Sequence, residues 1–283
     1  MEIQPLLTDL VERVKRVQGV RAIVLGGSRA RGTHTPKSDI DLGIYYHPDQ
    51  PLDLQALDQA SAELDDRHQP GLLTPIGGWG PWINGGGWLT VQGQPVDFLY
   101  RDLGKVSACI EACCAGEVEM VYQPGHPHGF SSSIYMAEVA ACQILWEADG
   151  QLSALKERTD PYPEPLKLAL IQKFGWEMGF SLMIARKAIE RGDVAYVAGC
   201  CFRCVGCLLQ VVFALNGQYW MNEKGAVALA DTFLVRPAML RGRIEKAFTL
   251  LAADRLALTE AIAVLDEVKR DTDLLATPRT DPA

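Results

Sequence analysis

The chain has 283 residues, of which 48% are hydrophobic and 22% charged, and its formal net charge is −8. This length is enough for two domains with cores of their own, and the composition is that of a soluble globular protein. The acidic balance argues against broad binding to a nucleic-acid backbone, which needs a basic surface. It does not exclude a nucleotide that arrives with Mg²⁺, because the ion supplies positive charge locally.

The N-terminal segment lacks the apolar stretch of a signal peptide. It reads MEIQPLLTDLVERVKRV, and its apolar residues recur at helical spacing, which predicts a helix over residues 5–17. The eight cysteines lie in helix-like sequence. This usage is typical of reduced thiols rather than of a disulfide framework, so we expect a cytoplasmic protein.

A glycine turn followed by two aspartates is the most informative motif. An apolar run over residues 20–25 predicts a buried strand that leads into Gly27-Ser28. Ten residues separate Ser28 from Asp39, and Asp41 follows within a second apolar run. Because residues i and i+2 of a strand point to the same face, the two carboxylates are expected to project together.

Such a pair of carboxylates indicates a metal site. Two carboxylates side by side repel each other and need a nearby cation. Hard oxygen ligands suit Mg²⁺, above all when the ion already carries substrate phosphates. The glycine-serine turn can present backbone N–H groups to those phosphates. The alternative is a strand edge with two solvated acids.

Gly27, Ser28, Asp39 and Asp41 together resemble the signature of the nucleotidyltransferase superfamily, which includes DNA polymerase β and the antibiotic nucleotidyltransferases. That signature is a Gly-Ser turn, a spacer, and Asp-x-Asp between apolar residues. The resemblance covers the chain well as far as Ala115. The C-terminal half is only loosely similar to the helical domains of aminoglycoside-type members.

The family also uses a third acidic residue on a later strand. The strand-like run Gln94–Tyr100 contains one acid, Asp97. The resemblance implies that Asp39, Asp41 and Asp97 are the catalytic residues and the ligands of two Mg²⁺ ions. The alternative for Asp97 is a strand-end acid that pairs with Arg101.

The resemblance further implies nucleotide-binding residues around the turn. They are Gly27 and Ser28, with Arg31 and Ser38 on the connection to the second strand. Arg29 and Arg31 give this connection local positive charge in an acidic protein, and arginine is a good bidentate partner for phosphate. A solvated surface position is the alternative for either arginine.

A segment rich in glycine and tryptophan occupies residues 71–88. Glycines give mobility and tryptophans give flat apolar area, so this segment could close over a substrate. The alternative is an irregular loop whose tryptophans plug the domain. Strands over 88–91 and 96–100 are predicted to form a hairpin around Gly93.

The order of elements predicts an α+β fold. Helices are expected over 52–67 and over 102–115, the second with Asp102 as its N-cap. With the strands they give a small mixed β-sheet with helices on one side, the nucleotidyltransferase domain, followed by an all-α helical bundle. The expected domains are residues 1–122 and the substrate-binding residues 131–275.

The linker between these domains spans residues 123–129. His126 and His128 are interpreted as loop residues, because two histidines in a proline turn with no further ligand make a poor metal site. Most of the chain from residue 133 to about residue 270 is predicted to be helical, including a helix over 135–148.

One of these helices is apolar enough to raise the question of a membrane. Residues 194–215 are nearly all apolar, but Arg203 near the middle is costly in a bilayer, so a buried helix of the bundle is predicted. Its cysteines are interpreted as small buried hydrophobes rather than metal ligands, and they are Cys200, Cys201, Cys204 and Cys207.

A lysine near the end of this region is a further candidate for the nucleotide site. Asn222 is expected to cap a new helix, and Lys224 in its first turn opposes the helix macrodipole. The place resembles that from which the helical domain of antibiotic-type members sends a lysine to the ATP phosphates. The alternative for Lys224 is a solvated side chain.

The resemblance implies an enzyme of the EC 2.7.7 type. It would use Mg²⁺ to transfer a nucleoside monophosphate, AMP from ATP or that of another NTP, to a hydroxyl of a small molecule such as an aminoglycoside-like antibiotic. Asp97 is the first candidate for the general base, with Glu111, Glu138 and Glu177 as alternatives. A protein side chain, an RNA end or a non-catalytic regulator are the other readings. No membrane partner is expected, nucleic acid is disfavoured, and no oligomeric state is indicated.

Overall fold

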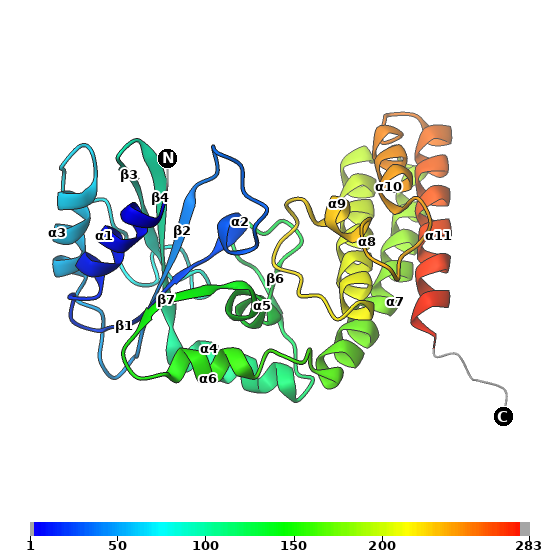
Figure 1. The fold of residues 1–283 in the computed structure, drawn as a ribbon. Helices are drawn as coiled ribbons and strands as arrows, with labels where there is room; N and C mark the ends of the chain where they lie inside the picture. Colours follow the sequence, from blue (N-terminus) through cyan, green and yellow to red (C-terminus); the bar gives the residue numbers. More distant parts are fainter. Residues whose placement is uncertain (1–2, 278–283) are drawn as a thin grey trace, which may run out of the picture. The chain divides into compact units, whose positions relative to one another are not determined.

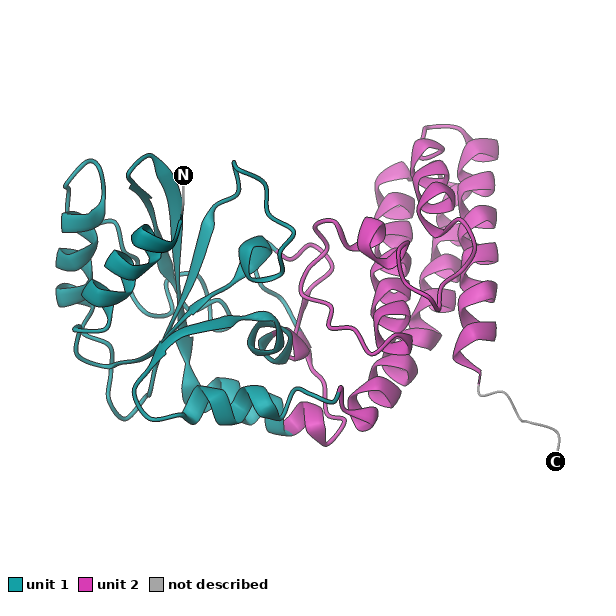
Figure 2. Cartoon of the chain, in the orientation of Figure 1, with its two compact units in different colours: residues 1–111, 121–125, 135–161 teal, residues 112–120, 126–134, 162–283 magenta. Residues whose placement is uncertain are grey.

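A computed structural model describes residues 3–277 of the chain (Figure 1). The sequence also predicts a disordered tail over residues 277–283, which apart from Thr277 lies outside the described residues. The chain divides into two compact units (Figure 2). The first unit comprises residues 1–111, 121–125 and 135–161, and the second comprises residues 112–120, 126–134 and 162–283. Each is described by itself.

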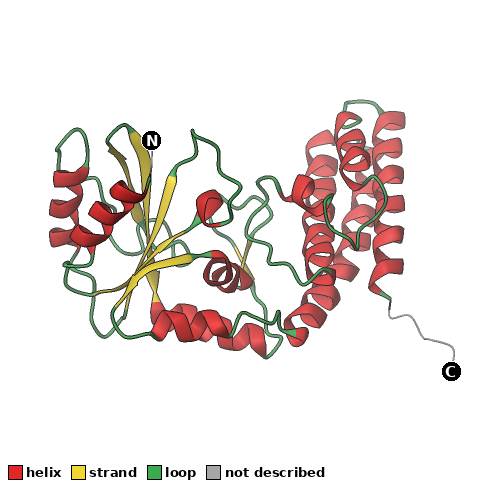
Figure 3. Cartoon of the chain, viewed as in Figure 1, coloured by secondary structure: helices red, strands yellow, loops and turns green. Residues whose placement is uncertain are grey.

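A five-stranded mixed sheet forms the centre of the first unit. The strand order is β3-β4-β2-β1-β7, in which β2 and β4 are parallel and the other neighbours antiparallel. The strands are β1 (Val20–Leu25), β2 (Ile40–Tyr46), β3 (Gly86–Val91), β4 (Gln94–Asp102) and β7 (Gln143–Glu147). The predicted mixed sheet followed by a helical region is therefore confirmed (Figure 3).

Alternate residues of β2 and β4 divide the sheet into two faces. Ile40, Leu42, Val96 and Phe98 are fully buried in one core with apolar residues of α1 (Gln4–Val14) and α3 (Leu54–Leu64). Because strand side chains alternate between faces, the residues between them, Asp41 and Asp97 among them, point to the opposite face. We call this opposite face the acidic face.

The acidic face also carries a helix, which corrects the prediction of helices on one side only. Arg101 lies four residues after Asp97 on β4 and therefore shares its face. Its guanidinium is buried and pairs with Glu138 of α5 (Ser133–Ala141). Helix α5 thus covers one part of the acidic face.

The remaining elements up to residue 161 are short, apart from one longer helix. Asp102 accepts a hydrogen bond from the backbone N–H of Lys105 at 3.0 Å, which confirms the predicted cap. The elements are α2 (Gly27–Ala30), α4 (Leu103–Cys114), β5 (Met120–Val121), β6 (Phe130–Ser131) and α6 (Gln151–Glu157).

The predicted helix over 135–148 is wrong in its second half. Helix α5 ends at Ala141, and Gln143–Glu147 forms β7, which pairs antiparallel with β1. The row of unpaired backbone groups along β1 accepts this segment, and the pairing overrides the helix-forming residues within it. As a result, residues 135–161 group with the first unit, although the predicted boundary lay between residues 122 and 131.

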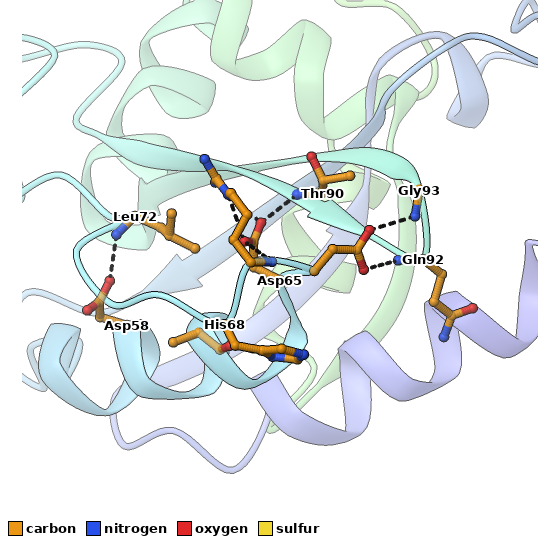
Figure 4. Close-up of polar contacts among 10 residues, drawn as sticks. Asp58, Asp65, His68, Leu72, Thr90, Gln92 and Gly93 are labelled. Carbon is orange, nitrogen blue, oxygen red and sulfur yellow. Dashed lines mark hydrogen bonds and ion pairs between the residues drawn. The ribbon is translucent and has the colours of Figure 1, made fainter.

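Three aspartates fix the segment between α3 and the β3–β4 hairpin (Figure 4). All three accept hydrogen bonds from backbone N–H groups. Asp58 binds those of Gly71 (2.8 Å) and Leu72 (3.0 Å), Asp65 that of Thr90 (2.7 Å), and Asp66 those of Gln92 and Gly93 (2.8 Å each). We call these residues the tethering aspartates.

The second unit is built mainly of helices. They are α7 (Glu164–Ile189), α8 (Val194–Leu215), α9 (Ala226–Ala230), α10 (Leu240–Thr249) and α11 (Arg255–Ala276). Among the described residues α8 is the one helix long and apolar enough to cross a membrane, and 78% of its most apolar stretch is buried within the structure. Its four cysteines are free and buried, as predicted.

Candidate active site

Asp41 and Asp97 lie directly opposite each other on neighbouring parallel strands. The register of β2 and β4 pairs the two residues, and their side chains leave the same face of the sheet. Asp39 precedes β2 by one residue and is exposed. The two aspartates of the Asp-x-Asp motif and the acid expected on a later strand therefore gather at one place on the acidic face.

The glycine turn at the end of β1 touches this group. The backbone N–H of Gly26 donates to the carbonyl of Asp41 at 2.8 Å. Gly27 has φ +58°, and a Cβ at this position would lie 1.8 Å from Oδ2 of Asp41. Only glycine fits here, because any side chain would collide with the carboxylate while adopting a left-handed backbone. Helix α2 begins at Gly27.

Asp97 lies among other negatively charged carboxylates. Burial raises the pKa of Asp97 to about 6, and the carboxylates of Asp41 and Asp39 add to this shift. A cation between these groups would lower the pKa again, and carboxylate oxygens are the donors that Mg²⁺ prefers. The donor set therefore fits a magnesium ion.

Among residues 3–277 there is no group of three His, Cys, Asp or Glu residues placed to hold a metal ion. The assignment of Asp39, Asp41 and Asp97 as metal ligands stays a prediction, based on the donor chemistry and the strand register.

Two further residues predicted to bind nucleotide lie on the connection between β1 and β2. Arg31 Nε donates to the carbonyl of Gly27 at 3.2 Å, and Ser38 Oγ accepts from the N–H of Thr35 at 2.9 Å. The guanidinium of Arg29 donates to the carbonyls of Asp39 (3.0 Å) and Ser38 (2.6 Å). Arg29 thus holds the backbone that leads into the Asp-x-Asp motif.

Of the alternative general bases, Glu138 and Glu177 already have arginine partners. Arg101 binds Glu138 through two contacts of 2.7 Å, so the alternative pairing of Asp97 with Arg101 is wrong as well. Glu177, in the second unit, pairs with Arg203. Glu111 is exposed on α4. A carboxylate held by a guanidinium is a weak base, so Asp97 remains the best candidate.

The segment rich in glycine and tryptophan is anchored by distant residues. Gln123 Nε2 donates to the carbonyl of Trp79 at 2.6 Å, and Asn84 Nδ2 donates to the hydroxyl of Tyr46 at 2.5 Å. The ammonium of Lys105 lies 3.9 Å from the ring centroid of Trp82. These anchors argue against the mobile cover suggested by the glycines.

Trp88 lies beside Asp97, which was not predicted from the sequence. It pairs with Asp97 across the β3–β4 hairpin, is 63% exposed and stacks on Trp79 with ring centroids 4.6 Å apart. The predicted turn at Gly93 contained the signal, because a two-residue turn at 92–93 fixes the pairing of residues 88 and 97.

One prediction for the second unit needs correction. Asn222 does not cap a helix, because α9 begins at Ala226 after Gly225, and its Oδ1 instead accepts from the N–H of Lys224 at 3.0 Å. Lys224 is exposed, and its role at the nucleotide stays a prediction.

His128 is not a loop side chain in solvent. Its ring is buried against α8, where a Cβ on Gly206 would lie 2.0 Å from Nδ1. Arg203 Nη1 donates to the carbonyl of His128 at 2.5 Å. Burial, together with the charge of Arg203, lowers the pKa of His128 to about 4. The histidine therefore serves to attach residues 126–134 to the second unit.

Comparison with known proteins supports the resemblance seen in the sequence. Residues 131–224 match a domain of unknown function, DUF4037, and no curated protein matches the chain. A nucleotidyltransferase-like protein from Exiguobacterium sibiricum 255-15 has a similar solved structure, with 11% identity, 96% of this chain and 75% of that chain covered, and a TM-score of 0.44. Residues 7–75 match the model of the nucleotidyltransferase domain, so this part of the chain is similar to the nucleotidyltransferase superfamily.

Proposed function

We propose that this chain is a Mg²⁺-dependent nucleotidyltransferase that moves a nucleoside monophosphate, AMP from ATP in the first instance, to a hydroxyl of a small molecule. The observation that carries the proposal is the pairing of Asp41 with Asp97 beside Gly27. This arrangement combines acidic oxygens for a metal with a backbone turn for phosphates, and it lies in a chain with a nucleotidyltransferase domain.

Asp39, Asp41 and Asp97 would hold Mg²⁺. When bound, the ion would neutralise phosphate charge and lower the pKa of the acceptor hydroxyl. Gly27 and Ser28 would bind the β- and γ-phosphates through backbone N–H groups. The acceptor oxygen would form a bond to the α-phosphorus while the bond to pyrophosphate breaks.

The carboxylate of Asp97 would accept the proton from the acceptor hydroxyl. Asp97 is preferred for this role because it lies beside Asp41, whereas Glu138 and Glu177 are held by arginine partners. Arg31, Ser38 and Lys224 are proposed to contact the nucleotide.

A small hydroxylated acceptor agrees with the charge of the chain. The net charge of −8 favours a neutral or cationic acceptor, such as an aminoglycoside-like compound, over an RNA end. The cysteines of the described residues form no disulfide, which supports the proposal that the protein works in the cytoplasm.

The test is to follow the α-phosphate. The protein is incubated with α-³²P-labelled NTPs, MgCl₂ and a panel of hydroxylated compounds, and the label and the pyrophosphate are both measured. We expect label on an acceptor, dependence on Mg²⁺, and a loss of about 10³-fold in rate for Asp41→Asn. Asp49→Asn is the matched control, because its side chain is 87% exposed in the same unit, and it should keep the wild-type rate.

Two results would contradict the proposal. Full pyrophosphate release by Asp41→Asn would show that Asp41 has no part in the reaction. Calorimetric binding of Mg²⁺-ATP without turnover on any acceptor would instead favour a nucleotide-binding regulator.

A further inference from the structure

One row of the sheet joins four features of the acidic face. Gly26 at the end of β1 donates its N–H to the carbonyl of Asp41 on β2. Asp41 pairs with Asp97 on β4, and Asp97 pairs with Trp88 on β3. Paired residues leave the same face of a sheet, and neighbouring strands lie about 4.8 Å apart. The glycine turn therefore stands at one end of the row and Trp88 at the other, with the two carboxylates between them.

The ring of Trp88 has a fixed support. It stacks on Trp79 with an interplanar angle of 28°. Gly86, two residues before Trp88, is closely enclosed, because a Cβ there would lie 1.8 Å from the carbonyl oxygen of Phe98 and 2.9 Å from Cζ3 of Trp79. The hydrogen bond from Gln123 to the carbonyl of Trp79 holds the backbone of Trp79 in place. The pair thus forms an ordered aromatic surface, and we call it the tryptophan platform.

Exposure of this platform is unusual for its place. A tryptophan in a strand of a closed core is expected to be mostly buried, yet 63% of Trp88 is exposed beside the carboxylates. An ordered exposed ring can bind a ligand at a low cost in conformational entropy, since its two χ angles are already fixed by the stack.

The geometry of in-line displacement indicates whether the leaving pyrophosphate or the acceptor lies over the tryptophan platform. This inference rests on the proposed function, in which the leaving pyrophosphate lies at Gly27 and Ser28. The entering oxygen approaches the α-phosphorus from the side opposite the leaving group. That side is the end of the row at which Asp97 and Trp88 lie.

We propose that the tryptophan platform binds the acceptor, and that the acceptor is a saturated hydroxylated ring, such as a sugar or cyclitol, whose C–H face lies on Trp88. The face of an indole is electron-rich and attracts C–H groups and cationic substituents. The neighbouring carboxylates add negative potential, so anionic rings are disfavoured. Trp88 is then a specificity-determining residue for the transfer reaction.

The test compares ring binding with nucleotide binding. The full chain is loaded with Mg²⁺ and α,β-methylene-ATP and titrated by calorimetry with kanamycin as a cationic ring probe, methyl β-glucoside as a neutral one and galacturonate as an anionic one. Trp88→Ala should weaken kanamycin binding about tenfold and leave α,β-methylene-ATP binding within about twofold of wild type. Trp88→Phe should keep most of the affinity, which separates loss of the ring from loss of the fold.

Trp176→Ala is the matched control. Trp176 is also 63% exposed, but it lies on α7 in the second unit, so its removal should change neither titration. We expect kanamycin to bind wild type more tightly than the glucoside, and galacturonate to bind most weakly.

Three outcomes would overturn the proposal. The first is that Trp88→Ala binds kanamycin as tightly as wild type does. The second is that Trp88→Ala weakens the binding of α,β-methylene-ATP by at least as much as the binding of kanamycin. The third is that wild type binds no ring probe up to about 10 mM. Pyrophosphate release that depends on Asp41 would show, in each case, that the proposed function itself survives. Failure of wild type to bind Mg²⁺ with the ATP analogue would overturn both proposals together.

Discussion

Two sets of three aspartates in the first unit have opposite electrostatic environments. The tethering aspartates accept backbone N–H groups, and the hydrogen bond from Arg67 to Asp65 holds the pKa of that carboxyl below its usual range. In the second set, Asp39, Asp41 and Asp97, burial and mutual repulsion raise the pKa of Asp97 to about 6. The same side chain thus stabilises the fold where donors surround it, and favours a bound cation where other carboxylates do.

Of three further changes that test this comparison, the one with the largest expected effect lies where the backbone touches the second set. Gly27→Ala would place a methyl group against the carboxylate of Asp41, displace it and lower the rate of nucleotidyl transfer about 100-fold. Gly32→Ala is the matched control, since Gly32 has φ +68° but no atom near its Cβ position. It should lower the free energy of unfolding by about 1 kcal/mol through backbone strain and keep the rate. Equal rates in the two variants would sink the idea that the contact with Asp41 matters.

A smaller effect is expected in the first set. Asp65→Asn removes the charge that binds Arg67 and should lower the free energy of unfolding at pH 7 by about 2 kcal/mol. Because the folded pKa is below the unfolded one, the stabilisation is present above the unfolded pKa and is lost as the pH falls through the folded pKa. Urea unfolding at pH 7, 5 and 3 measures this, and the difference between variant and wild type should shrink towards pH 3. A difference that stays constant with pH would contradict the charge-based explanation.

The smallest effect is a rise in the free energy of unfolding, opposite in sign to the change expected for Asp65→Asn. Asp97→Asn removes a repelled charge, so in the metal-free protein it should raise the free energy of unfolding above pH 6 by about 1 kcal/mol, a value reduced for solvent screening at a half-exposed group. The folded pKa lies above the unfolded one, so wild type loses stability as the pH rises from about 4 to about 6, and the variant does not. Denaturation curves at pH 4 and pH 8 in EDTA provide the measurement. A variant less stable than wild type at pH 8 would refute the prediction of repulsion.

Local patterns were enough to predict most of the first unit. Alternation gave the faces of β2 and β4, and Gly93 gave the hairpin. Strand β7 could not be found in this way, because Gln143–Glu147 has no turn or alternation signal of its own and becomes a strand only by pairing with β1. The same limit explains the tryptophan-rich segment, whose order depends on distant partners such as Gln123 and Tyr46.

The candidate site shows a similar division. The sequence placed Asp39 and Asp41 on one face, and the strand register then brought Asp97 beside them. The remaining roles depend on partners from distant parts of the chain. Glu138 was a candidate base, but it forms an ion pair with Arg101. The sequence had suggested Arg101 as a partner of Asp97. Competition between two acids for one arginine depends on tertiary packing and leaves no local trace in the sequence.

The antiparallel pairing of β7 with β1 has a consequence for modularity. The chain passes between the two compact units at residues 111/112, 120/121, 125/126, 134/135 and 161/162, so neither unit is a contiguous cassette. A fragment that stops at residue 122 would lack β7 and leave the backbone groups of β1 open to pairing with another molecule. Gene fusion or domain exchange in this chain therefore has to carry the sequence through residue 161, beyond the Pro-, Gly- and His-rich stretch at which a designer would first cut.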